Sequence, residues 1–346
     1  MGEAIVTRRG GGGVTITFDN YKVYGDTLNR STPTALSAAR DRLAGASVGD
    51  YALFAGGDTG SYSSVVDAYD TDLTRTTPTA LSVRRFYPAR AAIGSSALFA
   101  GGEIDYPNST SAVDAYDTEL TRTTPTALST ARLGLAGASV GGHALFAGGC
   151  TSAYTGSYSS VVDAYDTELT RTTPTALSTA RDQLAGASVG DYALFAGGSG
   201  PSSVVDAYST ELTRTTPTAL STGRDQLAGA SVGNYALFAG GSGPSSVVDA
   251  YDTDLTRTTP AALSTARRGL AGASIGNYAL FAGGYTGSYS SVVDAYTALT
   301  FLCIPITSGS KYKLNSDTET TATTNKVLEI FTPISGYIKY KGGKFE

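Results

Sequence analysis

A fifteen-residue motif recurs along the chain and constrains the fold more than any other feature. It reads LAGASVGDYALFAGG at residues 43–57, and five further copies follow, the first of them divergent. Those copies begin at Pro88, Leu135, Leu184, Leu227 and Leu270. The second glycine of the closing doublet recurs at intervals of 45, 47, 49, 43 and 43 residues. Six units at this period indicate a repeat architecture.

Each unit contains four short segments with strand character. An arginine is followed by a strand of small residues, the strand ALFAGG, a gap, the strand SVVDAY and the segment LTRTTPTALS. β-Branched and aromatic residues at strand length, punctuated by Gly-Asp, Gly-Asn and Gly-Gly pairs, predict strands, and no helical period is sustained. Four-stranded units at this period predict an all-β fold, a six-bladed β-propeller with four strands per blade.

The glycine doublet that ends a hydrophobic strand, followed by VDAYD, resembles the kelch repeat. The resemblance covers about residues 19–297 and implies a kelch-type propeller. One departure matters, because kelch blades usually have a tryptophan after Tyr-Asp, whereas this chain has LTRTTP there and no tryptophan at all. We therefore expect leucine and tyrosine to pack the blades.

The two ends of the repeat indicate how the ring closes. Residues 22–40 align with residues 67–85, placing Arg30 on Arg75, whereas the last unit lacks a fourth strand. We expect the N-terminal segment to supply that strand and so to remove a sheet edge. The expected organisation is a lead-in or attachment segment (1–18), the propeller (19–299) and a small β-rich C-terminal extension (300–346) for attachment or self-association.

Composition disfavours several classes of partner. The net charge is −5, and no basic run is longer than that of Arg8-Arg9, so a nucleic-acid partner is not expected. No window approaches the ~18 apolar residues of a membrane span, and the N-terminus has no apolar signal region. We expect a soluble protein made in the cytosol. Cys150 and Cys303 match no metal spacing, and whether they pair stays open.

Length varies in only one part of the unit. The opening arginine always precedes the second glycine of its doublet by 17 residues, whereas 8 to 14 residues separate that glycine from the aspartate of VDAY. Stretching such a loop costs only about 0.5 kcal/mol, so drift on an unused face is an alternative to function. However, the longer loops carry tyrosines among small polar residues, a composition typical of adaptable binding loops.

The two residues after each opening arginine also vary between otherwise similar units. In an up-and-down blade this connection and the variable loop emerge on the same face, so we expect a recognition surface there. The candidate ligand-binding residues are Asp41, Arg42, Tyr62, Phe86, Tyr87, Tyr106, Asn108, Tyr154, Tyr158, Asp182, Gln183, Asp225, Gln226, Arg268, Tyr285 and Tyr289.

No catalytic, metal or cofactor site is expected. The arginine and aspartate of each unit recur in every blade, which favours a structural role over catalysis. His143 has no nucleophile or carboxylate spaced around it, and one histidine is too few for a copper-oxidase type of site. RRGGGG at residues 8–13 lacks the ending of a phosphate loop. Arg90, where other inner strands have glycine, either projects into the channel or marks a divergent repeat.

The sequence therefore predicts a non-catalytic recognition protein that binds a cell-surface glycan or protein. The lead-in, AIVTRRGGGG, and the β-rich extension resemble modules of bacteriophage tail or receptor-binding fibre proteins, which implies location on a virion. Two alternatives stay open: a cytoplasmic kelch-type adaptor that binds a protein through the same face, and a propeller-type sugar-processing enzyme.

Overall fold

The computed structural model is built from β-strands joined by turns and loops. It describes residues 34–40, 42–152, 157–274 and 278–298 in full, and elsewhere the backbone of the strands given below. Within these ranges there is no helix, and hence none that is long and apolar enough to cross a membrane. The chain divides into two compact units, residues 32–298 and, together, residues 1–31 and 299–346.

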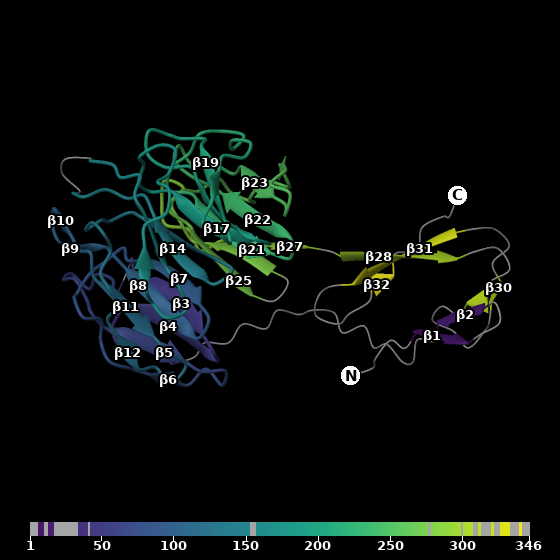
Figure 1. Ribbon diagram of the computed structural model, residues 1–346, viewed down its shortest axis with the longest axis horizontal. Coiled ribbons are helices and arrows are strands. Elements are labelled where there is room, and N and C mark those ends of the chain that lie inside the picture. The colour runs from purple at the N-terminus through teal and green to yellow at the C-terminus, as the bar shows by residue number, and fades with distance from the viewer. Residues whose placement is uncertain are drawn as a thin grey trace. The chain divides into compact units, whose positions relative to one another are not determined.

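The larger unit is a six-bladed β-propeller, whose sheets follow one another in chain order (Figure 1). From the channel outwards, the first blade contains β3 (Ala44–Val48), β4 (Tyr51–Ala55), β5 (Val66–Tyr69) and β6 (Arg75–Thr76). The second contains β7 (Ala89–Ile93), β8 (Ser96–Ala100), β11 (Val113–Tyr116) and β12 (Arg122–Thr123). The third contains β13 (Ala136–Val140), β14 (His143–Ala147), β15 (Val162–Tyr165) and β16 (Arg171–Thr172). The fourth blade contains β17 (Ala185–Val189), β18 (Tyr192–Ala196), β19 (Val205–Ser209) and β20 (Arg214–Thr215). The fifth contains β21 (Ala228–Val232), β22 (Tyr235–Ala239), β23 (Val248–Tyr251) and β24 (Arg257–Thr258). The sixth contains β25 (Ala271–Ile275), β26 (Tyr278–Ala282) and β27 (Val293–Thr297). All neighbouring strands are antiparallel, so the predicted all-β, six-bladed architecture is confirmed.

Further strands lie outside this regular pattern. The loop of the second blade forms a small hairpin of β9 (Glu103–Asp105) and β10 (Asn108–Ser109). The smaller unit contains a hairpin, a three-stranded sheet and a short strand pair. Their strands are β1 (Val6–Arg9) and β2 (Gly13–Ile16); β28 (Thr300–Ile306), β31 (Lys326–Thr332) and β32 (Lys339–Tyr340); and β29 (Lys311–Tyr312) and β30 (Thr320–Thr321).

Each joint between blades packs the small side chains of one sheet against the large side chains of the next. Leu145 and Val162 of the third blade belong to one buried cluster with Phe195 and Tyr208 of the fourth. Within each blade the phenylalanine and tyrosine meet edge to face, with ring centroids 5.8 to 6.1 Å apart. The expectation that leucine and tyrosine replace tryptophan is confirmed, with phenylalanine as the partner of tyrosine.

In the third to sixth blades the inner strand approaches that of the preceding blade so closely that only glycine fits at its second position. A Cβ added to Gly186 would lie 2.3 Å from the carbonyl oxygen of Gly137, in the preceding blade. Two residues further along, serines join the blades: the Ser188 hydroxyl donates to Ser139 O (2.5 Å) and accepts from Ser139 N (3.2 Å). The Ser231 hydroxyl repeats the donation to Ser188 O at 2.7 Å. The small residues of the repeated motif therefore make the joints around the channel.

A buried ion pair fixes each blade-to-blade connection to the sheet that follows it. Arg132 pairs with Asp163 and donates to Gly148 O at 2.6 Å, and Asp163 also accepts from Arg171 at 3.0 Å. The same carboxylate accepts the backbone N–H of Ser129 at 2.9 Å. The corresponding pairs are Arg40–Asp67, Arg85–Asp114, Arg181–Asp206, Arg224–Asp249 and Arg267–Asp294. The structural role predicted for the repeated arginine and aspartate is confirmed.

The N-terminal end of the repeat is described only from residue 34. There the Tyr69 hydroxyl donates to Thr34 O at 2.7 Å, and Arg40 binds Asp67 at 2.6 Å, as the later connections do in their own blades. The sixth sheet has three strands among the described residues. The segment predicted to add its fourth strand, residues 19–33, lies outside the described residues.

Candidate recognition face

The two variable sites of each unit lie together on one face of the propeller. In the second blade Phe86 and Glu103 exchange backbone hydrogen bonds of 3.1 and 2.9 Å, which join the blade-to-blade connection to the loop after the glycine doublet. The same pairing joins Leu133 to Cys150 in the third blade. We call this side, where the glycine doublets lie, the loop face. In these two blades the two variable sites are therefore hydrogen-bonded to each other.

The second residue of each connection forms a ring around the mouth of the channel, which we call the collar. Its members are Arg42, Tyr87, Gly134, Gln183, Gln226 and Gly269, all with φ between 51° and 65°. Backbone N–H groups link several successive members, as from Gln183 to Gly134 O (2.9 Å) and from Gln226 to Gln183 O (3.0 Å). Four members are not glycine, although this left-handed region costs other residues free energy. Because these four side chains are kept despite the cost in free energy, we treat the collar as part of the candidate surface.

An aromatic and cationic cluster lies where the first and second blades meet. Tyr62 and Phe86 have ring centroids 4.8 Å apart, and Phe86 and Tyr87 have centroids 5.1 Å apart. The Arg42 guanidinium lies 5.5 Å from the Phe86 centroid and 5.6 Å from the Tyr87 centroid. Phe86 is buried, whereas Tyr87 is 51% exposed, so Phe86 supports the cluster and Tyr87 presents it to solvent.

The buried carboxylate of Glu103 supports this cluster through a hydrogen bond to Tyr62. The Tyr62 hydroxyl donates to Glu103 Oε1 at 2.9 Å, and Glu103 is itself buried. Desolvation and this hydrogen bond raise the pKa of Tyr62, so its phenol stays protonated. Sequence reasoning missed Glu103, which directly follows the second glycine of its doublet.

The sixth blade carries a second, smaller cluster. The Arg268 guanidinium lies 5.2 Å from the Tyr285 centroid, and the Tyr285 and Tyr289 rings meet edge to face at 5.9 Å. Tyr289 is 95% exposed, the largest exposure among the large apolar side chains of the described residues. An aromatic side chain held in this position by neighbours contributes contact area at low entropic cost.

The long loops of the second and third blades touch each other. Ser109 donates to Thr151 O at 2.9 Å, and Asn108 donates to Asp105 at 3.1 Å. Tyr106 and Tyr158, in these two loops, are both exposed. Two of the candidate residues, Asp41 and Tyr154, lie outside the described residues.

The remaining candidates differ in exposure. Asp182 is buried and accepts a hydrogen bond from the Ser199 hydroxyl, so its carboxylate holds the adjoining loop. Asp225 is half-buried, and its backbone N–H donates to Ser242 Oγ at 3.3 Å. Gln226 is also half-buried, whereas Gln183 is exposed.

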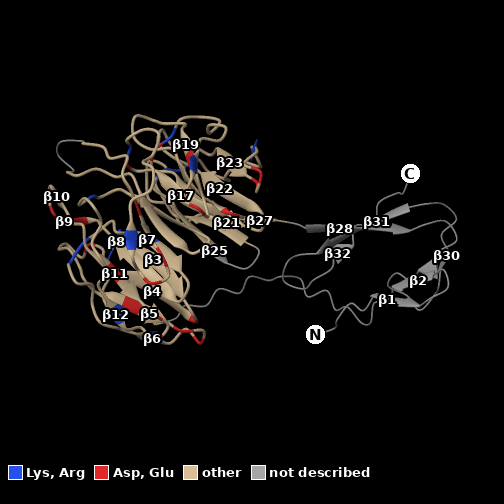
Figure 2. Cartoon of the chain, in the orientation of Figure 1, with Lys and Arg blue, Asp and Glu red and all other residues tan. Residues whose placement is uncertain are grey.

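Two reactive side chains of the described residues, Cys150 and His143, lie apart from each other. Cys150 is a free buried thiol, and burial raises its pKa to about 12, which disfavours the thiolate nucleophile. His143 begins β14 at the opposite end of the blade and is half-buried. Over the described ranges there is no group of three His, Cys, Asp or Glu side chains that could hold a metal. Figure 2 shows basic and acidic residues interspersed over the propeller.

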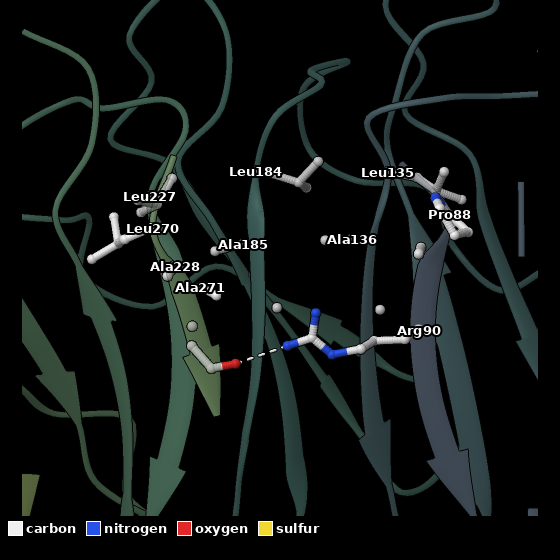
Figure 3. Close-up of a pocket in the computed structure, with 15 residues that line it drawn as sticks. Pro88, Arg90, Leu135, Ala136, Leu184, Ala185, Leu227, Ala228, Leu270 and Ala271 are labelled. Atoms are coloured by element: carbon white, nitrogen blue, oxygen red, sulfur yellow. Dashed lines mark hydrogen bonds between the residues drawn. The ribbon is translucent and has the colours of Figure 1, made fainter. Parts of the chain in front are cut away.

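The channel opens inside the collar. A cavity of about 210 Å³ is lined by the inner strands of the second to sixth blades (Figure 3). Arg90 projects into it, which decides between the two alternatives that the sequence left open.

The comparisons with known proteins support the fold. No protein-family model and no curated protein matches the chain. A solved structure described as "Structure of YjhT" is similar with a TM-score of 0.61 and 13% identity, over 84% of this chain and 99% of that one. At this identity the similarity supports the architecture alone. The chain is thus a six-bladed β-propeller, and the kelch and phage-tail resemblances stay predictions.

Proposed function

We propose that the protein is a non-catalytic recognition module of kelch type, which binds a cell-surface glycan or protein through its loop face. The observation that carries the proposal is the exposure of Tyr87, Tyr106 and Tyr158 on the one face where both variable sites meet. Tyrosine combines a large apolar ring with a polar hydroxyl and is enriched where binding energy is concentrated.

The collar gives independent support. Non-glycine residues in the left-handed region lower stability, so their retention at the mouth of the channel requires a compensating interaction. At Leu212, which has a φ of 60°, this interaction is packing against the core between the third and fourth blades. Tyr87 has the same kind of backbone but is half exposed. Contact with a ligand best explains why Tyr87 keeps this strained backbone.

We further propose a place for this module on the tail or fibre of a phage particle, with the smaller unit used for attachment. This proposal rests on the resemblance of the N-terminal segment and the β-rich extension to such proteins. Co-purification of the chain with virions tests it, and binding to a cytoplasmic protein in the absence of virions would favour the adaptor alternative.

The recognition role is tested by replacing Tyr87, Tyr106 and Tyr158 together with serine. Binding to whole target cells and to a glycan array should weaken at least about tenfold, because truncating an aromatic anchor typically costs more than 1 kcal/mol. The matched control is Tyr235→Ser, which removes a 40% exposed tyrosine from the opposite end of a blade. Equal binding by the triple variant and the control, with unchanged thermal melts, would place recognition elsewhere.

A further inference from the structure

Arg90 occupies a position where the other inner strands have glycine. Its backbone keeps the place that the repeat assigns, because a Cβ added to Gly137 in the next blade would lie 2.0 Å from Arg90 O. The side chain has no space within the joint and instead extends across the channel (Figure 3). There its Nη2 donates to Gly272 O, in the sixth blade, at 2.8 Å.

The charge of this guanidinium has no carboxylate partner among the described residues. Each arginine that opens a repeat unit binds an aspartate, for example Arg181 with Asp206 at 2.8 Å. Arg90 has five N–H donors, and the only acceptor that the described residues offer is one carbonyl oxygen. The Arg90 side chain is exposed to the open lumen, so its remaining donors face solvent there. A small oxyanion in the lumen would match the charge and the planar geometry of the guanidinium.

The cavity restricts the size and shape of such an anion. Its volume of about 210 Å³ is smaller than a typical drug-sized pocket. No acidic side chain is among the described residues that line it. At the collar end the lining is formed by Pro88, Leu135, Leu184, Leu227 and Leu270, and the four leucines are mostly buried in the joints between blades. A compact anion would therefore be held chiefly through its charge on Arg90.

We propose that the channel is a binding site for a small oxyanion, anchored by the Arg90 guanidinium. This site is distinct from the loop-face surface and does not depend on the proposed recognition function. The alternative is that Arg90 only braces the second blade against the sixth through Gly272.

Binding is measured by calorimetry on the full chain in low-salt buffer, with butyrate, acetate, sulfate and inorganic phosphate as separate probes. The test variant is Arg90→Gly, which restores the residue found in the sister blades and is therefore compatible with the fold. The control is Arg84→Gly, which removes an equal charge from an exposed position. We expect binding of at least one of these anions by the wild type and by Arg84→Gly, and at least tenfold weaker binding by Arg90→Gly.

Thermal melts separate this proposal from the brace. A bound anion raises the melting temperature of the wild type in proportion to the logarithm of its concentration, and Arg90→Gly should lose this dependence. A brace would give a lower melting temperature in Arg90→Gly and no response to any anion in either protein. Absence of binding by the wild type to all four probes, or equal binding by Arg90→Gly, would overturn the proposal.

Discussion

The joint between the fifth and sixth blades and the outer side of the sixth blade have nearly the same sequence but different surroundings. Val248, in the fifth blade, is fully buried, whereas Val293, its counterpart in the sixth, is 58% exposed. Likewise Ala228 is buried, whereas Ala271 is exposed. The repeat therefore specifies both sides of a joint, but a buried core forms only where the neighbouring blade supplies the matching side.

The first blade, which follows the sixth around the ring, shows a matching loss of burial. Its Phe54 is half-buried, whereas Phe99 and Phe195 at the same place in other blades are fully buried. A Cβ added to Gly45 would meet Phe54 of its own blade first, at 3.3 Å, and not a carbonyl of another blade. The seam between the sixth and first blades is thus looser than the other joints.

The largest expected effect concerns the buried carboxylates. Asp163→Asn leaves Arg132 and Arg171 without a charged partner and should lower the free energy of unfolding by about 3–5 kcal/mol. Asp294→Asn, at the seam, should cost about 1–2 kcal/mol, because Asp294 is 15% exposed and has one arginine partner among the described residues. Denaturant titration measures both values, and equal losses would contradict the comparison.

A companion variant tests the predicted closing strand. The alignment of Arg30 with Arg75 predicts that Arg30 supplies a second partner to Asp294, as Arg75 does to Asp67 at 3.0 Å. If so, Arg30→Ala and Arg75→Ala should be similarly destabilising. A neutral Arg30→Ala would argue against closure by the N-terminal segment.

A smaller effect is expected from adding one methyl group to the inner strands. Gly186→Ala places a Cβ 2.3 Å from a backbone carbonyl, so the strands must separate, at a cost of about 2–3 kcal/mol. Gly45→Ala meets only a half-buried phenylalanine ring, which can move, and should change stability by less than about 1 kcal/mol. Thermal melts of the two variants compare the joint with the seam, and a reversed order would mean that the seam is the tighter contact.

The smallest effect is expected from truncating the paired valines. Val248→Ala removes two buried methyl groups and should cost about 1–2 kcal/mol. Val293→Ala should stay within about 0.5 kcal/mol, as for other exposed positions. Equal losses in chemical denaturation would show that the outer side of the sixth blade is covered in solution.

The repeat made much of the fold predictable, because its spacing sets the number of blades and its invariant residues set the joints. A structural role for Arg132 and Asp163 followed from their recurrence, whereas their pairing with each other was seen only in the structure. The collar could not be predicted, since Arg42, Tyr87 and Gln183 share a backbone conformation that their side chains do not indicate. The burial of Asp182 was also hidden, because it depends on Ser199 in a separate loop. The N-terminal closing strand stays a prediction.

The serine hydroxyls that join the inner strands have a consequence for how the gene can change. Ser188 contacts the strand before it through the same groups by which Ser231 contacts Ser188, so successive joints are interchangeable. Recombination between two copies of the repeat would delete or duplicate a whole unit and leave compatible partners on each side of the junction. Variation in blade number is then limited by the geometry of the ring and not by the chemistry of the joints.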